Sequence, residues 1–431
     1  MDTGDTAWML ISTAMVLLMT PGLAMFYGGM VRAKGVLNMM MMSFISMGLV
    51  AVVWVLYGYS MTFGKDLGSG LLGSPTESFG LTEILGSDSL FGTIPTSVFA
   101  VFQMMFAIIT VALISGAIAD RARFGAWILF VIVWVTLVYF PVAHWVFDFD
   151  EKDSDGNVID PGGWIANDLA AIDFAGGTAV HINAGIAALA LAFVLGKRVG
   201  FGREPFKPHN LTLVMLGAAL LWFGWFGFNS GSAVAANATA GVVMLNTVAA
   251  TGAAMLAWLL VERVRNGHAT SLGAASGIIA GLVAITPACS AVDPLGAMAI
   301  GAIASAACAY AVSLKYKLGY DDSLDVVGLH LVAGLIGSIF IGFFATSSAP
   351  AGVDGLFYGG GSEQLVKQII ASFAVLAYSF IATWLIAKVI DRTMGFRITQ
   401  EAEITGIDLA VHAESSYEIG SQGATRGGYA S

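Results

Sequence analysis

The run Asp173-Phe-Ala-Gly-Gly-Thr-Ala-Val-His-Ile-Asn-Ala-Gly185 continues as Ile-Ala-Ala-Leu-Ala-Leu-Ala-Phe-Val-Leu195, so an acid and a histidine stand in one long apolar segment. An α-helix needs about 20 apolar residues to cross a hydrocarbon core about 30 Å thick, and this run is long enough. The predicted spans are 6–31, 36–63, 93–119, 124–147, 173–195, 211–234, 242–262, 270–286, 295–314, 326–346 and 365–390. The fold is therefore predicted as an all-α polytopic membrane protein with eleven transmembrane helices.

The composition supports this fold class. Hydrophobic residues make up 57% of the 431 residues and charged residues only 11%, whereas a soluble domain has about 25% charged residues. This excludes a soluble enzyme. The acidic start and the long first apolar run predict a retained span rather than a signal peptide. Cys289 and Cys308 lie in or beside apolar segments, so we expect no disulfide framework, no metal cluster and no cofactor.

Basic residues predict the orientation of the chain. Sixteen of the 19 Lys and Arg residues lie in alternate connections and at the C-terminal end, from Arg32 to Arg426. The other connections hold only Lys65, Lys152 and Lys367. Cytoplasmic loops carry the excess of Lys and Arg, so we expect the N-terminus outside and the C-terminus in the cytoplasm. Termini on opposite sides require an odd number of spans.

An acid followed by a histidine occurs in two of the predicted spans, and this recurrence predicts an internal repeat. The fifth span opens with Asp173 and carries His181, and the tenth opens with Asp325 and carries His330. Two inverted five-helix repeats, about 6–195 and about 211–346, would be followed by an eleventh helix over 365–390. Such folds place the substrate site at the repeat interface near mid-membrane. Residues 1–390 would form the transmembrane domain and 391–431 a cytoplasmic regulatory tail.

His181 and His330 are the candidate pore residues because each lies inside an apolar helix. Ionisable groups at membrane depth are costly and usually face a cavity or one another. Two neutral imidazoles can accept and donate hydrogen bonds and pass a proton near neutral pH. The alternative is a pair of packing histidines bonded to neighbouring carbonyls. His144, at the end of the fourth span, is interpreted as structural.

Aromatic residues and one acid are candidates for a cation site. Phe102 and Phe106 share a face of the third span, and Trp225, Phe226 and Phe228 crowd the sixth. Aromatic faces attract cations, although most of the 27 phenylalanines should pack or face lipid.

Asp173 could bind a cation directly, but a carboxylate at a helix start favours a capping role. The acidic loop 148–168 is interpreted mainly as a solvated surface, with cation collection near the pore mouth as a secondary role. Its resemblance to a calcium loop is weak because Gly162 stands where the bidentate Glu is expected.

The Asp173–Gly185 stretch resembles the signature of the ammonium transporter (Amt/Mep/Rh) family, prokaryotic Amt type. Further segments match in order along nearly the whole chain. They are Gly224-Trp-Phe-Gly-Phe-Asn-Ser-Gly-Ser232, Gly281-Leu-Val-Ala-Ile-Thr-Pro-Ala-Cys289, Ser323-Leu-Asp-Val-Val-Gly-Leu-His330, Gly196-Lys-Arg-Val-Gly-Phe-Gly202, Gly395-Phe-Arg-Ile398 and Gly406-Ile-Asp-Leu409.

The resemblance implies roles for the residues that match. His181 and His330 would be the pore histidines, Phe106 and Phe228 the stacked rings at the outer mouth with Phe102 beside them, and Trp225 a pore-lining ring. Ser232 would bind the ammonium ion, and Asp173 would be required for activity. Phe147 stands where the family usually has an outer-site Trp, with Trp145 two residues before it.

The resemblance also implies partners and a function. It implies a homotrimer with one pore per subunit, a tail that binds a PII-type nitrogen-regulatory protein, and ammonium, ammonia and methylammonium as substrates. The protein would bind ammonium outside, deprotonate it and conduct ammonia, with a separate transfer of the proton. The alternatives are an ammonium-sensing receptor with little flux and a passive ammonia channel. An enzyme is not expected because no Walker loop or catalytic elbow stands beside the histidines.

Overall fold

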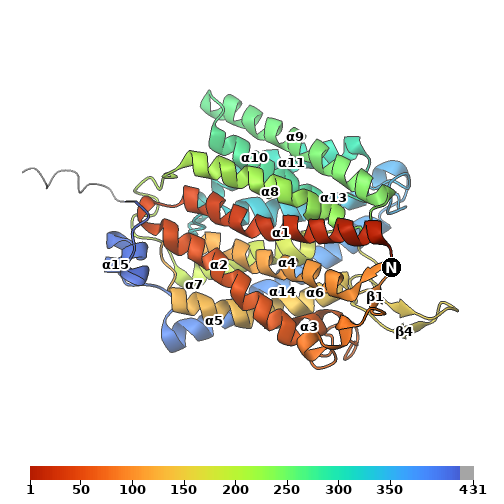
Figure 1. Ribbon diagram of the computed structural model, residues 1–431. Coiled ribbons are helices and arrows are strands. Elements are labelled where there is room, and N and C mark those ends of the chain that lie inside the picture. Colours follow the sequence, from red (N-terminus) through yellow and green to blue (C-terminus); the bar gives the residue numbers. More distant parts are fainter. Residues whose placement is uncertain (418–431) are drawn as a thin grey trace, which may run out of the picture.

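A computed structural model describes residues 1–417, which form one bundle of helices (Figure 1). The helices run roughly parallel between an end that carries the N-terminus and two small β-hairpins and an end that carries α15. The membrane-length helices without an internal irregularity are α1 (Thr3–Met30), α8 (Leu211–Gly231), α9 (Ala238–Asn266), α11 (Pro294–Ala311) and α14 (Glu363–Met394).

The other long helices are assembled from shorter pieces. They are α2 (Val36–Val53) with α3 (Tyr59–Phe63), α4 (Thr96–Ile114) with a 3₁₀ turn to Ile118, α5 (Phe124–Trp134) with α6 (Phe140–Phe147), α7 (Asn183–Leu195), and α13 (Val332–Phe344). The short helices are α10 (Ser271–Ile285), α12 (Leu314–Leu318) and α15 (Gln400–Thr405). The hairpins are β1 (Leu90–Phe91) with β2 (Ile94–Pro95), and β3 (Glu151–Lys152) with β4 (Val158–Asp160), both antiparallel.

Ten helices within residues 1–417 are long and apolar enough to cross a membrane, and each corresponds to a predicted span within a few residues. This makes the chain a multi-pass membrane protein. The remaining predicted span, 270–286, forms α10, which has only 15 residues. The count of eleven spans therefore stays a prediction that depends on α10.

π-helical turns widen several of the helices. They occupy Trp54–Gly58 between α2 and α3, Val135–Tyr139 between α5 and α6, Gly177–Ile182 before α7 and Val327–Leu331 before α13. Single π-turns inside helices occur frequently at functional sites. Two of these turns contain the histidines that the sequence singled out, His181 and His330.

Glycines allow α1 and α8 to pack closely along their lengths (Figure 1). A Cβ atom on Gly217 would lie 2.4 Å from the backbone nitrogen of Phe26, and one on Gly29 would lie 2.7 Å from the carbonyl oxygen of Asn210. Neither contact is possible for a larger residue. Small residues at helix interfaces replace the hydrophobic force that lipid does not supply.

The described part of the tail packs against the ends of the helices rather than extending away. Both carboxylate oxygens of Asp408 accept backbone hydrogen bonds at the start of α2, from Leu37 at 3.0 Å and Asn38 at 2.8 Å. The side chain of His412 contacts that of Asn38 at 3.1 Å. The remainder of the predicted tail, residues 418–431 with Arg426, lies outside the described residues.

Candidate functional site

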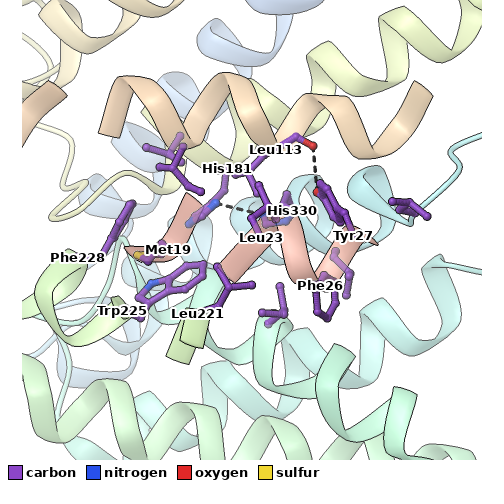
Figure 2. A pocket seen from close by; sticks show the side chains of 15 residues that line it. Met19, Leu23, Phe26, Tyr27, Leu113, His181, Leu221, Trp225, Phe228 and His330 are labelled. Carbon is purple, nitrogen blue, oxygen red and sulfur yellow. Dashed lines mark hydrogen bonds between the residues drawn. The ribbon is translucent and has the colours of Figure 1, made fainter. Parts of the chain in front are cut away.

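The two histidines lie next to each other in the interior of the protein (Figure 2). The Nδ1 atoms of His181 and His330 lie 3.3 Å apart, and the centroids of the two rings are 5.3 Å apart. Both residues are buried, with 1% of His181 and 3% of His330 exposed. A hydrogen bond between two Nδ1 atoms requires one neutral ring to donate and the other to accept. In a pair of neutral rings, the two histidines would therefore be different tautomers.

The histidines line a narrow and mainly apolar cavity. Its walls come from α1, α4, α8, α10 and the segments around the histidines, and they include Met19, Leu23, Leu113, Leu221 and Ile279. The free volume is about 10 Å³. This is roughly the volume that one water molecule needs. The Nε2 atom of His181 has no hydrogen-bond partner among the described residues, so it can bind a small guest.

Stacked aromatic rings close one end of this cavity. The rings of Phe106 and Phe228 stack with centroids 4.2 Å apart, and the Phe102 ring packs edge-on against Phe106 at 4.9 Å. Phe228 lies 6.1 Å from the His181 ring, and Trp225 lies 5.4 Å from it. The structure thus brings the predicted gate residues together directly beside the first histidine.

Trp225 is fixed in place by a contact that the sequence did not suggest. Its indole N–H donates to the hydroxyl of Thr286 at 2.8 Å. Thr286 belongs to the Gly281–Cys289 motif and caps the end of α10. The short helix α10 therefore helps to orient a ring of the pore wall.

A wider depression, which we call the vestibule, lies beyond the stacked rings. Phe147, Asp173 and Ser232 line it, and its volume is about 430 Å³. The Ser232 hydroxyl donates to the Phe228 carbonyl at 2.8 Å. Phe106 does not line the vestibule, but its ring lies 6.3 Å from that of Phe147. The predicted outer-site residues are thus brought to one mouth of the cavity.

Asp173 caps the segment that carries His181. Its two carboxylate oxygens accept hydrogen bonds from the backbone of Gly176 at 2.9 Å, Gly177 at 2.5 Å, Thr178 at 2.7 Å and Ala179 at 3.2 Å, and from the Thr178 hydroxyl. A carboxylate offers about four lone-pair directions, so five donors fill them. This geometry leaves Asp173 no free lone pair for a cation and favours the structural role.

The capping counterpart of Asp173 on the second histidine segment is Asp322. Its carboxylate accepts from the backbone of Val326 at 3.0 Å and of Val327 at 2.7 Å. The prediction that Asp325 is the equivalent of Asp173 in the second repeat is wrong, because the Asp325 carboxylate accepts a hydrogen bond from the Lys315 ammonium at 2.6 Å. Asp173 and Asp322 each stand eight residues before a histidine, and this equal spacing could have identified Asp322.

Phe147 has no tryptophan substitute in the vestibule. The indole N–H of Trp145, two residues earlier, donates to the carbonyl of Leu71 at 2.8 Å, outside the residues that line the vestibule. His144 is fully buried, with ring nitrogens 2.9 Å from the Thr62 carbonyl and 3.3 Å from the Asp66 carboxylate. Its position agrees with the structural role assigned to it.

The acidic loop forms the β3–β4 hairpin rather than an open calcium loop. The Asp153 carboxylate accepts backbone bonds from Asp155 and Asn157, both at 2.9 Å, within the hairpin. The side chain of Asp150 accepts from the backbone of Gly162 at 3.0 Å. Within residues 1–417 no group of three or more His, Cys, Asp or Glu side chains is arranged to hold a metal ion.

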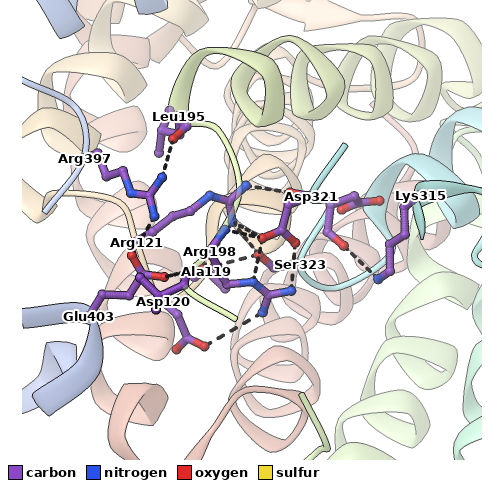
Figure 3. A network of polar contacts seen from close by, with 12 residues as sticks. Ala119, Asp120, Arg121, Leu195, Arg198, Lys315, Asp321, Ser323, Arg397 and Glu403 are labelled. Atoms are coloured by element: carbon purple, nitrogen blue, oxygen red, sulfur yellow. Dashed lines mark hydrogen bonds and ion pairs between the residues drawn. The ribbon is translucent and has the colours of Figure 1, made fainter. Parts of the chain in front are cut away.

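A buried ionic network occupies the opposite end of the bundle (Figure 3). Arg198 donates from its backbone and guanidinium to the Asp321 carboxylate at 2.7 to 3.0 Å, and Arg121 donates to the Ser323 hydroxyl at 2.6 Å. Burial alone would raise the pKa of Asp321, but the Arg198 hydrogen bonds and the Arg121 charge hold the pKa of this carboxyl below its ordinary value. The next residue, Asp322, is the cap described above.

The tail joins this network through Glu403. The Glu403 carboxylate accepts from the backbone of Val199 at 2.6 Å and pairs with Arg397 at 2.7 Å. Arg397 also donates to the carbonyl of Leu195, at the end of the helix that follows His181. A continuous set of polar contacts thus connects the tail with both histidine segments.

A bundle of membrane-length helices that encloses a narrow cavity next to an open vestibule is typical of membrane transport proteins. The family model "Ammonium Transporter Family" matches residues 7–417. The chain is 60% identical to an ammonium transporter of Mycobacterium tuberculosis, with 97% of this chain and 91% of the relative covered. The chain therefore belongs to the ammonium transporter family.

Solved structures give the same result for the fold. Candida albicans Mep2 matches with a TM-score of 0.83 at 34% identity, covering 93% of this chain and 87% of that one. A structure titled "Sensor Amt Protein" matches with a TM-score of 0.84 at 29% identity, covering 94% of this chain and 98% of that one. The resemblance found in the sequence motifs is confirmed.

Proposed function

We propose that this protein transports ammonium selectively across the cytoplasmic membrane by conducting ammonia past His181 and His330 and moving the proton separately. The observation that carries the proposal is the 3.3 Å contact between the two imidazoles inside a cavity of about 10 Å³. Membership of the ammonium transporter family supports the choice of substrate.

The size and polarity of the cavity favour a neutral guest. A bare ammonium ion would lose its hydration in a passage walled by Met, Leu and Phe side chains, and this loss is very costly for an ion. Ammonia, which is neutral, avoids most of that cost. It can donate to or accept from the unpaired Nε2 atom of His181, while the proton moves along the pair of rings.

The vestibule is proposed as the site that receives the ion. Phe147 and the stacked Phe106 and Phe228 rings attract a cation through their faces, and the Ser232 hydroxyl oxygen keeps lone pairs for an ammonium N–H. Asp173 acts at short range through the cap and at longer range through its charge. This division of roles follows from the five hydrogen bonds that already fill its oxygens.

The membrane arrangement carries over as part of the proposal. Eleven spans, with α10 as the short one, would place the N-terminus outside and the tail in the cytoplasm, as the Lys and Arg distribution predicts. The matching caps on the two histidine segments support an inverted repeat. A homotrimer and a PII-type partner at the tail remain proposals from the family resemblance.

Currents measured on purified protein in a supported bilayer test the proposal, with ammonium compared against potassium. Selective deprotonation predicts a large ammonium current and almost no potassium current. Equal currents would show that the pore passes hydrated or bare cations and would end the proposal. The chain is also similar to a structure titled "Sensor Amt Protein", so a second candidate function is an ammonium-sensing receptor. A receptor predicts ammonium binding with negligible current. A passive ammonia channel predicts uptake without current.

A further inference from the structure

The segment that leads into the vestibule is held by a side chain from α14, the last long helix. Gln368 is 1% exposed, and its carbonyl oxygen accepts from the backbone N–H of Ile172 at 2.7 Å. Its amide nitrogen donates back to the Ile172 carbonyl at 2.7 Å and also to the Ser338 carbonyl on α13 at 2.9 Å. One amide group therefore bonds three backbone groups on two other segments.

The Ile172 contact acts directly on Asp173. The Ile172 carbonyl belongs to the peptide bond that joins these two residues, so the Gln368 bond fixes the peptide plane from which Asp173 extends. On the other side of Asp173, the backbone N–H of Phe174 donates to the Pro287 carbonyl at 3.2 Å. The capping carboxylate is thus held by a clamp on each side.

The Ser338 contact links this clamp to the second histidine. Ser338 lies on α13, the helix that continues from the turn containing His330. The first turn of the His181 segment packs tightly here, because a Cβ atom on Gly177 would lie 2.6 Å from the Ser338 hydroxyl oxygen. Gln368 therefore ties together the two segments whose histidines must stay 3.3 Å apart.

The hydrogen-bonding capacity of Gln368 is fully used. Its oxygen also accepts from the Gln364 amide at 2.9 Å, so two lone pairs and two N–H groups all have partners. Buried polar groups at membrane depth are costly, and those that persist usually serve a function. α14 is otherwise an apolar helix whose buried polar side chains face the protein, among them Gln364, Ser372 and Thr383.

We propose that Gln368 is a positioning residue for ammonium recognition: it fixes Ile172 so that Asp173 caps the His181 segment, and it holds that segment in register with α13. This inference rests on the proposed function for its ammonium part. The clamp itself is a property of the fold and can be tested without transport.

Hydrogen–deuterium exchange on the purified protein tests the clamp. The four amides that Asp173 caps, in residues 176–179, report directly on the position of the carboxylate. Gln368→Met keeps the length of the side chain but removes every hydrogen bond. We expect exchange at these amides to rise about tenfold, as for a loss of roughly 1.4 kcal/mol of local stability. Ser372→Ala is the matched control, because Ser372 is fully buried on the same helix and its hydroxyl has no hydrogen-bond partner among the described residues.

Ammonium currents on the same proteins test the functional part. Gln368→Met should raise the half-saturating ammonium concentration at least about threefold, which corresponds to roughly 0.65 kcal/mol of binding, while the maximal current changes less. Ser372→Ala should leave both values near those of the wild type. Gln368→Asn, one methylene shorter, gives a milder variant that should shift exchange and half-saturation in the same direction if the Met variant fails to assemble.

Several results would overturn the proposal. One is unchanged exchange in 176–179 in an assembled Gln368 variant. A second is an equal rise of exchange in Ser372→Ala, which would indicate general loosening of α14. A third is raised exchange with an unaltered half-saturating concentration. If the wild-type protein carried no ammonium current, the proposed function would fail, and the exchange experiment would still decide whether the clamp exists.

Discussion

The cap formed by Asp173 leads to a prediction that separates a structural carboxylate from a cation ligand. One oxygen accepts from two donors and the other from three. Asp173→Asn replaces one oxygen by an NH₂ group, so two or three hydrogen bonds are lost. At about 1 kcal/mol of net stability per bond, the expected loss is about 2–3 kcal/mol for Asn and about 4–5 kcal/mol for Ala.

Water in the vestibule reduces these figures, because Asp173 is only partly buried and freed amides near the mouth can be solvated. The order of the variants is unaffected by this correction. In thermal unfolding of the detergent-purified protein, we expect the wild type to have the highest midpoint, Asp173→Asn a lower one and Asp173→Ala the lowest. Asp173→Ser should recover part of the loss relative to Ala, because Ser is a good N-cap without a charge.

The assay pairs unfolding midpoints with ammonium currents on the same preparations. If Asp173 acts as a cap, current should follow stability across the series, and Ser should be more active than Ala. Asp168→Asn is the control, since it removes an exposed negative charge from the same loop. A variant Asp173→Asn with wild-type stability would refute the capping argument, and a stable but inactive Asp173→Ser would show that transport requires the negative charge rather than the cap.

Three further changes test other parts of the molecule. Replacing both His181 and His330 by Leu should abolish selective ammonium current while size-exclusion chromatography shows normal assembly, and an unchanged current would disprove the proton path. Phe147→Trp should tighten vestibule binding by about 0.5 kcal/mol through the stronger indole face, measured as half-saturation, and weaker binding would mean that Phe147 does not face the ion. Asp321→Asn should lower stability at pH 7 by up to about 3–5 kcal/mol, since it removes the carboxylate 2.9 Å from the buried Arg198 and leaves only the 3.9 Å ion pair with Asp120. The pKa of Asp321 in the folded protein lies below its unfolded value of about 3.9. Ionised Asp321 therefore stabilises the folded protein above that pH, and this stabilisation is lost as the pH falls further. The difference between the unfolding midpoints of the wild type and Asp321→Asn should thus become smaller toward pH 3. A gap that stays constant from pH 7 to pH 3 would contradict this account.

The sequence predicted those parts of the fold that depend on local composition. Apolar length was sufficient to predict the ten long helices, because a membrane span is defined by its own residues. Apolar length did not decide whether α10 crosses the membrane, because its 15 residues are fewer than the about 20 that a span needs. Its neighbours in the bundle bury it, and such burial depends on contacts with distant helices.

The residues of the candidate site also fall into two groups: those recognisable from the local sequence and those recognisable only from three-dimensional contacts. His181 and His330 could be found because an ionisable group is conspicuous in an apolar run. Asp322 was missed in favour of Asp325 because the nearer acid appeared to start the helix, and only the three-dimensional turn shows which carboxylate reaches the free amides. Gln368 was missed because its partners lie 30 and 196 residues away in the sequence. No local pattern encodes such a contact.

The two caps also bear on how a cation could approach the histidine segments, because each segment starts at a carboxylate. A helix start carries a partial charge of about +0.5, which repels ammonium. Asp173 neutralises the start at the vestibule, and Asp322 does so for the His330 segment at the end that carries the ionic network. Both carboxylates lie at segment starts rather than beside the rings, so the histidine cavity keeps its uncharged walls. The negative charges are thereby separated from the uncharged cavity, and under the proposed function this separation favours a proton that leaves before the nitrogen enters the cavity.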